Sequence, residues 1–341
     1  MKRFKKILVD ESVFDYPLTT RFLHALSSIP RRIITLEEVD ARLRGKVVEA
    51  SHPAEAKRTL LITRNSGSFL KYMGTDPDVG DTCRQASWRL DMFQGCPADC
   101  SYCFCQQYLS CHHVVAFVNF DDLAVPAFDA EKVSIVTGDI ADSLALADLS
   151  IIAHHYISSF LPENCLIELR SKFCLPSSWR RLNPERFKLD WSLTPPDQWR
   201  KNEHGTSDPA QRIQSAATAA KLGYKVGIRL DPLQPDAIDH DHYKKLLLDL
   251  KQAMKPAQPT EFTIGSYKMS SELLEKIRSR FPSSPLPGYE WGRGKDGKLR
   301  PFKFVRLRSY QIIFSLIDEI FPGIPAYSSI EQNYVLNHLL P

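Results

Sequence analysis

A short run of cysteines constrains this chain more than any other feature. Within residues 94–105, Cys96, Cys100 and Cys103 have the spacing C-x3-C-x2-C, and Tyr102 stands just before the third. Three thiolates on one short loop cannot complete a tetrahedral zinc site. They can hold three irons of a cubane [4Fe–4S] cluster and leave the fourth iron open for a small ligand. The loop therefore predicts an iron–sulfur centre.

A zinc site is the alternative that the same cysteines allow. Its fourth ligand would come from Cys105, Cys111, His112 or His113, which follow closely in the chain. The spacing with an aromatic residue is unusual for zinc, so the cluster is favoured. Cys105 is then expected to be a packed residue and Cys111 a surface residue.

Composition narrows the class of protein. The chain has 341 residues, 43% hydrophobic and 25% charged, which is ordinary for a soluble globular protein. Its net charge of +4 permits a nucleic-acid partner without arguing for one. Clustered cysteines in a long chain indicate a metal site in a reducing compartment. We expect no membrane span, no secretory signal and a cytoplasmic location.

The pattern of apolar residues predicts an α/β fold with parallel strands. We expect an N-terminal extension over residues 1–85, a partial (β/α)6-type barrel over 86–282, and a basic hairpin with a closing helix over 283–341. The predicted strands are 59–63, 87–93, 114–120, 132–137, 165–171, 187–193, 225–230 and 261–266. The predicted helices are 14–26, 146–161, 208–222, 242–254, 270–281 and 309–320.

Polar residues follow several of these strands. Gly138, Asp139, Lys172, Thr194 and Asp231 each stand at a strand end. In parallel α/β barrels the ligand site lies at the carboxyl ends of the strands, so these side chains are candidates for one site. Lys172 is expected to pair with a carboxylate there, the alternative being a solvated strand end.

Two histidine pairs have structural explanations. His240 and His242, each preceded by an aspartate, look like metal ligands but open a predicted helix, where acidic residues are favoured in any case. His154 and His155 lie in the middle of a predicted helix, and we expect them to be structural.

The C-terminal part is basic and aromatic. Residues 276–308 contain ten Lys or Arg against two acids, with Tyr, Trp and Phe interleaved. Such a stretch suits a nucleic-acid backbone and an unstacked base. We predict nucleic-acid contacts for Arg293, Lys295, Lys298 and Arg300, and the alternative for each is a solvated hairpin.

The cysteine spacing with its aromatic residue is the hallmark of radical S-adenosylmethionine (SAM) enzymes. Within that class the chain resembles spore photoproduct lyase over most of its length. The similar segments are 95–103, 117–123, 137–139, 171–173, 192–194, 205–207 with Arg212, 223–227, 291–293 and 321–323.

The resemblance implies a partial (β/α) barrel that carries SAM and one [4Fe–4S] cluster. It implies reductive cleavage of SAM to a 5′-deoxyadenosyl radical that acts on a thymine-dimer-type DNA lesion, and a reductant such as flavodoxin or ferredoxin. Cys96, Cys100 and Cys103 would hold the cluster. With the strand-end positions, it gives a set of expected SAM contacts: Tyr102, Phe104, Gly138, Asp139, Lys172, Thr194 and Asp231.

The chain departs from the family where a hydrogen atom is returned to the substrate. The family's donor cysteine corresponds to Val136, and the tyrosine after the third cluster cysteine corresponds to Phe104. The SAM-contacting serine is Gly138. Cys105, Cys165 or Cys174 could replace the donor, and Cys174 is nearest the expected site, so Tyr102 and Cys174 are the predicted catalytic residues.

Three functions follow from these features. The first is a radical SAM lyase of the spore-photoproduct type that acts on DNA. The second is a radical SAM enzyme of the same fold with another substrate, a modified nucleic acid or a peptide, because the expected donor cysteine is Val136. The third is a non-catalytic nucleic-acid-binding protein that carries a cluster or zinc. It is disfavoured because candidate site residues follow each of several predicted strands.

Overall fold

The computed structural model describes residues 4–47, 53–73, 79–80, 88–128, 133–234 and 240–339. The chain divides into two compact units. The first comprises Met1–Met73, Ala86–Asp99 and Cys105–Phe187, and the second comprises Gly74–Gln85, Cys100–Phe104 and Lys188–Pro341. No helix within the described ranges is long and apolar enough to cross a membrane.

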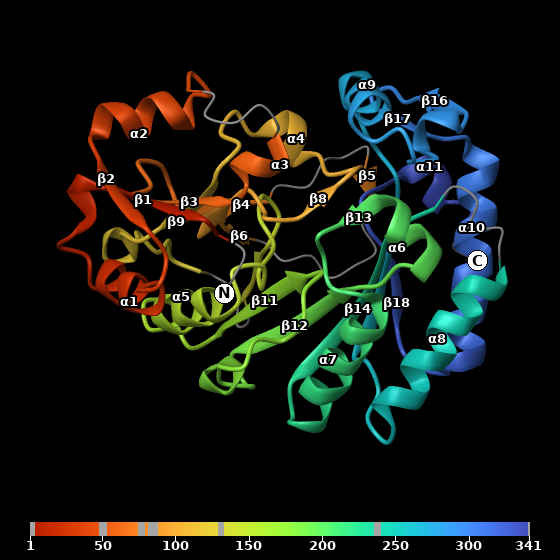
Figure 1. The fold of residues 1–341 in the computed structure, drawn as a ribbon. Helices are drawn as coiled ribbons and strands as arrows, with labels where there is room; N and C mark the ends of the chain where they lie inside the picture. Colours follow the sequence, from red (N-terminus) through yellow and green to blue (C-terminus); the bar gives the residue numbers. More distant parts are fainter. Residues whose placement is uncertain are drawn as a thin grey trace. The chain divides into compact units, whose positions relative to one another are not determined.

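A mainly parallel sheet forms one layer of the first unit (Figure 1). Its order is β2-β1-β3-β9-β7, and only β7 runs antiparallel, against β9. The strands β1 and β3 are runs of apolar residues buried on both faces, as parallel strands usually are. The bounds are β1 Lys6–Asp10, β2 Arg31–Ile34, β3 Thr59–Thr63, β7 Phe93–Gln94 and β9 Val114–Phe117.

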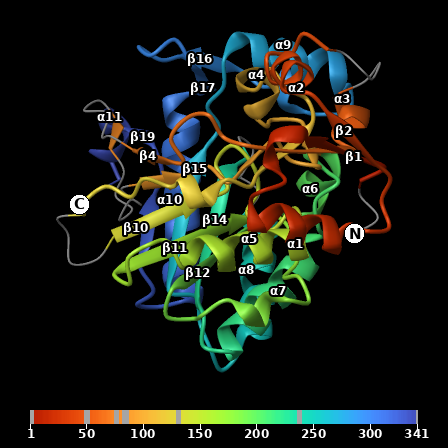
Figure 2. The same cartoon turned by 90° about the vertical axis from the view of Figure 1, so that its left-hand side faces the viewer.

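A second group of strands in this unit carries the predicted site residues. Its order is β4-β6-β10-β11, with β6, β10 and β11 parallel and β4 antiparallel. Helices α1 and α5 lie side by side in both ribbon views (Figure 2). The bounds are β4 Leu70–Tyr72, β6 Trp88–Leu90, β10 Val133–Thr137, β11 Cys165–Ser171, α1 Pro17–Ala25, α2 Leu36–Leu43, α3 Pro53–Ala56, α4 Cys105–Tyr108 and α5 Asp148–Ser158.

Two predicted strands belong to other sheets than the sequence analysis expected. The strand predicted at 114–120 is β9, which pairs with β3 of the N-terminal sheet and not with the barrel strands. The segment predicted at 87–93 forms two short strands, β6 and β7, in different sheets, and Ser87 and Lys132 lie outside the described residues. An apolar run predicts a strand but carries no information on its partner.

The second unit contains the parallel strands β12, β14, β15 and β18. The first residue of β12, Phe187, is assigned to the first unit and the rest of the strand to the second. Helices α7 and α8 pack together, and α10 packs on α8 (Figure 1). Helix α10 begins at Lys303, earlier than predicted. The strands are β5 Val79–Gly80, β8 Asp99–Cys100, β12 Phe187–Ser192, β13 Glu203–His204, β14 Lys225–Leu233, β15 Glu261–Ser266, β16 Trp291–Arg293, β17 Leu299–Pro301, β18 Ala326–Ser328 and β19 Glu331–Gln332. The helices are α6 Pro196–Asn202, α7 Pro209–Lys221, α8 His240–Met254, α9 Ser271–Arg280, α10 Lys303–Ile320 and α11 Asn333–Leu336.

Helix α7 confirms its predicted start and stop. The Asp208 side chain accepts the Ala210 N–H, and Gln211 completes a capping box. Pro209 occupies the first turn, and Gly223 follows the last turn with φ +86°. Helix α8 begins at His240, so the histidines of residues 240–242 belong to a helix start, as predicted.

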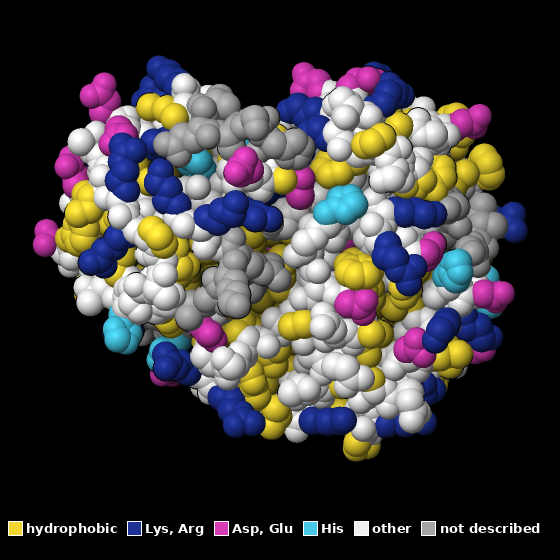
Figure 3. All heavy atoms as spheres, in the orientation of Figure 1, with side chains coloured by type: hydrophobic (Ala, Val, Ile, Leu, Met, Phe, Trp, Pro, Cys, Tyr) yellow, Lys and Arg dark blue, Asp and Glu magenta, His cyan; other side chains and the backbone are white. Residues whose placement is uncertain are grey.

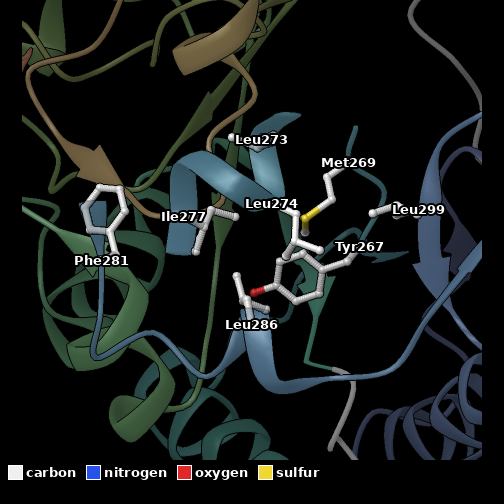
Figure 4. Close-up of a cluster of buried hydrophobic side chains, with 8 residues drawn as sticks. All are labelled: Tyr267, Met269, Leu273, Leu274, Ile277, Phe281, Leu286 and Leu299. Atoms are coloured by element: carbon white, nitrogen blue, oxygen red, sulfur yellow. The ribbon is translucent and has the colours of Figure 1, made fainter. Parts of the chain in front are cut away.

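A cluster of apolar side chains supports α9 and the hairpin β16–β17 (Figure 4). Leu273, Leu274 and Ile277 project from α9, and Leu286 approaches them from the segment after it. The remaining members are Tyr267, Met269, Phe281 and Leu299. Tyr102 of the cysteine loop packs against this cluster. Burial of such side chains stabilises the fold by about 1.5–3 kcal/mol each, so the cluster also anchors the loop.

Gly227 of β14 tests how tightly the second unit is packed. A Cβ at this position would lie 2.3 Å from Oδ1 of Asp190. That carboxylate is buried, and its other oxygen binds Lys188 Nζ at 3.2 Å, so it has little room to move. We expect Gly227→Ala to lower the free energy of unfolding by about 1–3 kcal/mol in urea titrations. A Cβ at Gly288 would meet nothing within 4 Å, so Gly288→Ala is the control. Equal effects of the two variants would show that Asp190 yields easily.

Candidate functional site

The first cysteine of the loop belongs to the first unit. Gly95 has φ +75°, and its N–H donates to the Ile140 carbonyl oxygen at 2.8 Å. This bond ties the residue before Cys96 to the segment that follows β10. Cys96 therefore follows a residue that is bonded to the segment after the predicted strand-end residues Gly138 and Asp139.

The other two cysteines lie in the segment Cys100–Phe104, which packs within the second unit. The Cys103 N–H donates to the Cys100 carbonyl oxygen at 3.1 Å, which closes a tight turn. Ser101 donates twice to Asn202, through its N–H to the backbone oxygen at 2.8 Å and through its hydroxyl to Oδ1 at 2.8 Å. Phe104 is 48% exposed. The turn is thus fixed from the α6–β13 junction.

A buried ion pair supports this segment. Arg212 and Glu203 are both fully buried, and Nη2 lies 2.5 Å from Oε2. The Tyr102 hydroxyl and the Thr194 hydroxyl both donate to Oε1 of the same carboxylate. Burial, with the Glu203 charge, raises the pKa of Tyr102 well above its usual value, so the phenol stays protonated. Tyr102 and Thr194, both predicted SAM contacts, are thus brought together through Glu203.

In the first unit, Gly138 follows β10 in a conformation that favours glycine. Its φ is +96°, and a Cβ would lie 2.6 Å from Ser143 Oγ and 2.7 Å from the Arg170 carbonyl oxygen. These contacts leave no room for a side chain at this position, where the sequence resemblance leads us to expect a serine. Glycine at position 138 therefore fits the local backbone and its neighbours.

Asp142 joins the ends of β10 and β11. Its carboxylate accepts the Ser171 hydroxyl at 2.7 Å, the Lys172 N–H at 2.7 Å and the Leu144 N–H at 3.0 Å. Burial raises the pKa of Asp142, while these bonds and the Lys172 charge act against that rise. Sequence reasoning did not identify this residue, because its partners lie on another strand.

Asp139 already has a cationic partner. Arg170 of β11 lies 3.5 Å from Asp139 Oδ1 and 2.6 Å from Glu168 Oε1. Asp139 and Lys172 are both partly exposed at the ends of neighbouring strands. The structure thus brings Gly138, Asp139 and Lys172 together, with Arg170 as an added cation.

The cysteines considered as replacement hydrogen donors differ in position. Val136 is fully buried in β10. Cys165 pairs with Val133 at the start of β11, so it lies about 20 Å from the strand end at 3.3 Å per residue. That distance rules out Cys165 as a donor at the strand end. Cys174 follows Lys172 and is partly exposed, and Cys105 opens α4.

His154 is structural, as predicted. Nδ1 lies 2.7 Å from the Ser150 carbonyl oxygen and therefore carries the proton, so Nε2 accepts the Thr137 hydroxyl at 3.1 Å. Thr137 in turn lies 2.8 Å from Ser143 Oγ. This hydrogen-bond network fixes Thr137 and Ser143, which flank the turn at Gly138.

Asp231 of the second unit lies inside β14, not after it, because the strand continues to Leu233. Arg229 Nη2 is 3.1 Å from its carboxylate. Burial lowers the pKa of nearby Lys268, and the Asp231 charge acts against that shift. Gly265 leaves space for the carboxylate, since a Cβ there would lie 2.4 Å from Oδ1.

The hairpin β16–β17 corrects one predicted nucleic-acid contact. Arg300 is 4% exposed, and both of its terminal nitrogens bind Asp296, at 2.7 and 2.8 Å. That bidentate bond holds the pKa of Asp296 at about 2. Arg300 therefore fixes the hairpin and cannot face a phosphate. Arg293, Lys295 and Lys298 are exposed, and on the face in Figure 3 the cationic side chains are interspersed with acidic and apolar ones.

Two of the residues considered as a fourth zinc ligand lie in the protein interior. His113 is buried with Nδ1 3.1 Å from the Ala56 carbonyl oxygen, and Cys111 is buried, not on the surface as expected. Within the ranges that the structure describes, no three His, Cys, Asp or Glu side chains are close enough together to hold a metal ion. The thiol donors Cys96, Cys100 and Cys103 suit iron better than magnesium or calcium, and they stay the predicted cluster ligands.

Fold and strand ends together define an α/β protein of parallel strands and covering helices, with polar and cysteine residues at the strand ends. This is the fold class that the sequence predicted.

Known proteins share this architecture over nearly the whole chain. Spore photoproduct lyase of Clostridium acetobutylicum is 25% identical over 318 residues, which cover 88% of this chain and 87% of the relative. A spore photoproduct lyase complexed with dinucleoside spore photoproduct has a TM-score of 0.79 at 18% identity, over 96% of this chain and 99% of that one. A variant with bound AdoMet and the same dinucleoside has a TM-score of 0.77 at 18% identity, with 95% and 99% coverage. No family model matches the chain. The predicted resemblance to spore photoproduct lyase is confirmed.

Serine at position 138 is expected to destabilise the fold. In Gly138→Ser, the unfavourable φ and the clash with Ser143 and Arg170 should lower the free energy of unfolding by about 3 kcal/mol in urea. Gly223 has φ +86° but nothing within 4 Å of a Cβ, so Gly223→Ser measures the backbone term alone. We expect about 1 kcal/mol for that control. If both variants lose the same amount, the clash at Gly138 is absent.

His154 should make the protein less stable in acid. Burial lowers its pKa from 6.5 to about 4. Between these values the unfolded chain binds more protons, so stability is full above pH 6.5 and falls as the pH decreases, by up to about 1.4 kcal/mol per unit. Thermal unfolding of wild type and His154→Gln between pH 7 and 4 measures the difference, since every other ionisable group is the same in the two proteins. Identical pH slopes would contradict the prediction.

Proposed function

We propose that this chain is a radical SAM enzyme that acts on a thymine-dimer-type lesion in DNA. The observation that carries the proposal is a relative, spore photoproduct lyase, that matches 88% of the chain and whose fold recurs in the structure. When bound, a [4Fe–4S] cluster and SAM supply the one-electron reduction on which the chemistry of this class depends. A reductant such as flavodoxin or ferredoxin would deliver the electron in a reducing, cytoplasmic compartment.

The residues of the chain would have two tasks, to bind the cluster and SAM and to exclude water from them. Cys96, Cys100 and Cys103 would ligate the cluster. Lys172, positioned by the bond from its N–H to Asp142, would bind the SAM carboxylate. Asp139, which also lies 3.5 Å from Arg170, would bind the SAM amino group. In the second unit, Thr194 and Asp231 would line the SAM site. Apolar burial around Tyr102 excludes water, which a radical reaction requires.

A DNA substrate is supported by the relatives and by the hairpin. Solved spore photoproduct lyases are bound to dinucleoside spore photoproduct. Here Arg293, Lys295 and Lys298 are exposed at the tip of a hairpin whose base is fixed by Arg300. Exposed cations of this kind can bind phosphates.

A second candidate has a specific observation in its favour. Val136 is a buried aliphatic residue, and the resemblance to the lyases predicts their donor cysteine at this position. The enzyme would then act on another substrate, a modified nucleic acid or a peptide. Alternatively, Cys174, which is partly exposed after Lys172, returns the hydrogen atom, and the DNA lesion remains the substrate.

An anaerobic assay separates these candidates. Reconstituted protein with reductant and SAM should release 5′-deoxyadenosine, and Cys100→Ala should reduce that release at least about a hundredfold through loss of a cluster ligand. An oligonucleotide with a thymine–thymine methylene cross-link should be repaired to two thymines. Cys174→Ala should retain SAM cleavage and lose repair, with Cys165→Ala as the matched control.

The possible results are distinct. Zinc in place of iron would contradict both enzyme candidates. SAM cleavage with no repaired thymines would favour the second candidate. Full repair by Cys174→Ala would exclude that cysteine as the donor.

A further inference from the structure

The junction of α6 and β13 contains a buried amide whose donor is unused. Asn202 is fully buried, and its Nδ2 has no hydrogen-bond partner among the described residues. An unpaired buried N–H is destabilising, because the group has lost its hydrogen bonds to water and gained none. We therefore expect the Asn202 Nδ2 to donate to a group that is bound in the functional protein.

The orientation of this amide follows from its neighbours. The hydroxyls of Ser101 and Ser284 lie 2.8 and 2.7 Å from Oδ1. Ser284 Oγ already accepts the Leu286 N–H at 3.4 Å, so its own hydrogen is available to Asn202. Oδ1 is therefore the acceptor of both hydroxyls, and Nδ2 is the side left with an unpaired donor.

The Asn202 side chain contacts the cysteine loop directly. Ser101 lies between Cys100 and Cys103 and binds Asn202 through both its N–H and its hydroxyl. The neighbouring Glu203 binds Tyr102 in the same loop. Asn202 and Glu203 thus bind two successive residues of the loop, Ser101 and Tyr102. The Nδ2 donor of Asn202 is not used in these bonds.

We propose that Asn202 is a positioning residue for the cysteine loop and that its Nδ2 donates a hydrogen bond to a sulfur of the bound [4Fe–4S] cluster. The inference rests on the proposed function, because it requires that the loop holds a cluster. Cluster sulfurs accept hydrogen bonds, and such bonds raise the reduction potential by stabilising the reduced, more negative state. Asn202 would then adjust how readily the cluster is reduced.

Three variants test the role of this donor. Asn202→Asp keeps the acceptor for both serines and removes the N–H, and Asn202→Ala removes both. Ser284→Ala is the control, since it removes one hydroxyl from Oδ1 and leaves Nδ2 intact. Each protein is reconstituted anaerobically, its iron and sulfide are measured, and its reduction potential and electron paramagnetic resonance spectrum are recorded without SAM.

We expect iron and sulfide of about four each per chain in the wild type, as one cubane cluster requires. Both Asn202 variants should show a more negative potential and an altered spectrum, and Ser284→Ala should match the wild type. Circular dichroism of the apoproteins checks folding, and Asn202→Ser replaces Asn202→Ala if that variant does not fold.

Several results would overturn the inference. Potentials unchanged in both Asn202 variants would remove the donor role, since a merely structural residue alters stability and not the potential. A shift in Asn202→Asp alone would be an effect of the added charge. An equal shift in Ser284→Ala would trace the effect to loop position. A wild type that binds no iron would instead defeat the proposed function itself.

Discussion

The second unit depends on the buried ion pair between Glu203 and Arg212. Two charges removed from water cost several kcal/mol each unless they are paired and fully hydrogen-bonded. Here the guanidinium donates to Glu203, to the Ser192 and Ser207 carbonyl oxygens and to the Thr206 hydroxyl, at 2.5–2.9 Å. The carboxylate in turn receives Tyr102 and Thr194. One pair therefore connects a strand end, the loop after β13 and the cysteine turn.

In the first unit, the carboxylate of Asp142 has a comparable role. Asp142 accepts bonds from Ser171, Lys172 and Leu144, and so fixes the ends of β10 and β11 to each other. In both units a hydrogen-bonded carboxylate orders a backbone segment, and predicted site residues stand next to it. Rigid support of this kind is what a binding site needs, because loosely held groups lose affinity and rate.

Local patterns could be predicted from the sequence, and contacts between distant residues could not. The strands Thr59–Thr63, Cys165–Ser171 and Glu261–Ser266 were predicted at their observed bounds, because continuous apolar runs define them. The cap at Asp208 follows from residues three positions apart. By contrast, Asp142 and Asn202 matter through partners about 30 and 100 positions away, which no local pattern contains. The sequence pattern predicts Arg300 as a phosphate contact, because its pairing with Asp296 depends on how the hairpin folds back.

The loop and the residues that would end the reaction are under different physical constraints. Ser101 and Tyr102 are bound to Asn202 and Glu203, so a substitution there would leave buried polar groups unpaired and weaken the fold whatever the substrate. Val136 fills a buried strand position that any aliphatic residue or cysteine of similar volume satisfies, and Phe104 is 48% exposed. The fold therefore resists change in the loop and tolerates it at Val136 and Phe104, the two positions where the sequence comparison predicts a departure from the lyases. The loop proposed to support SAM chemistry is thus more tightly constrained by the fold than the residues proposed to end the reaction.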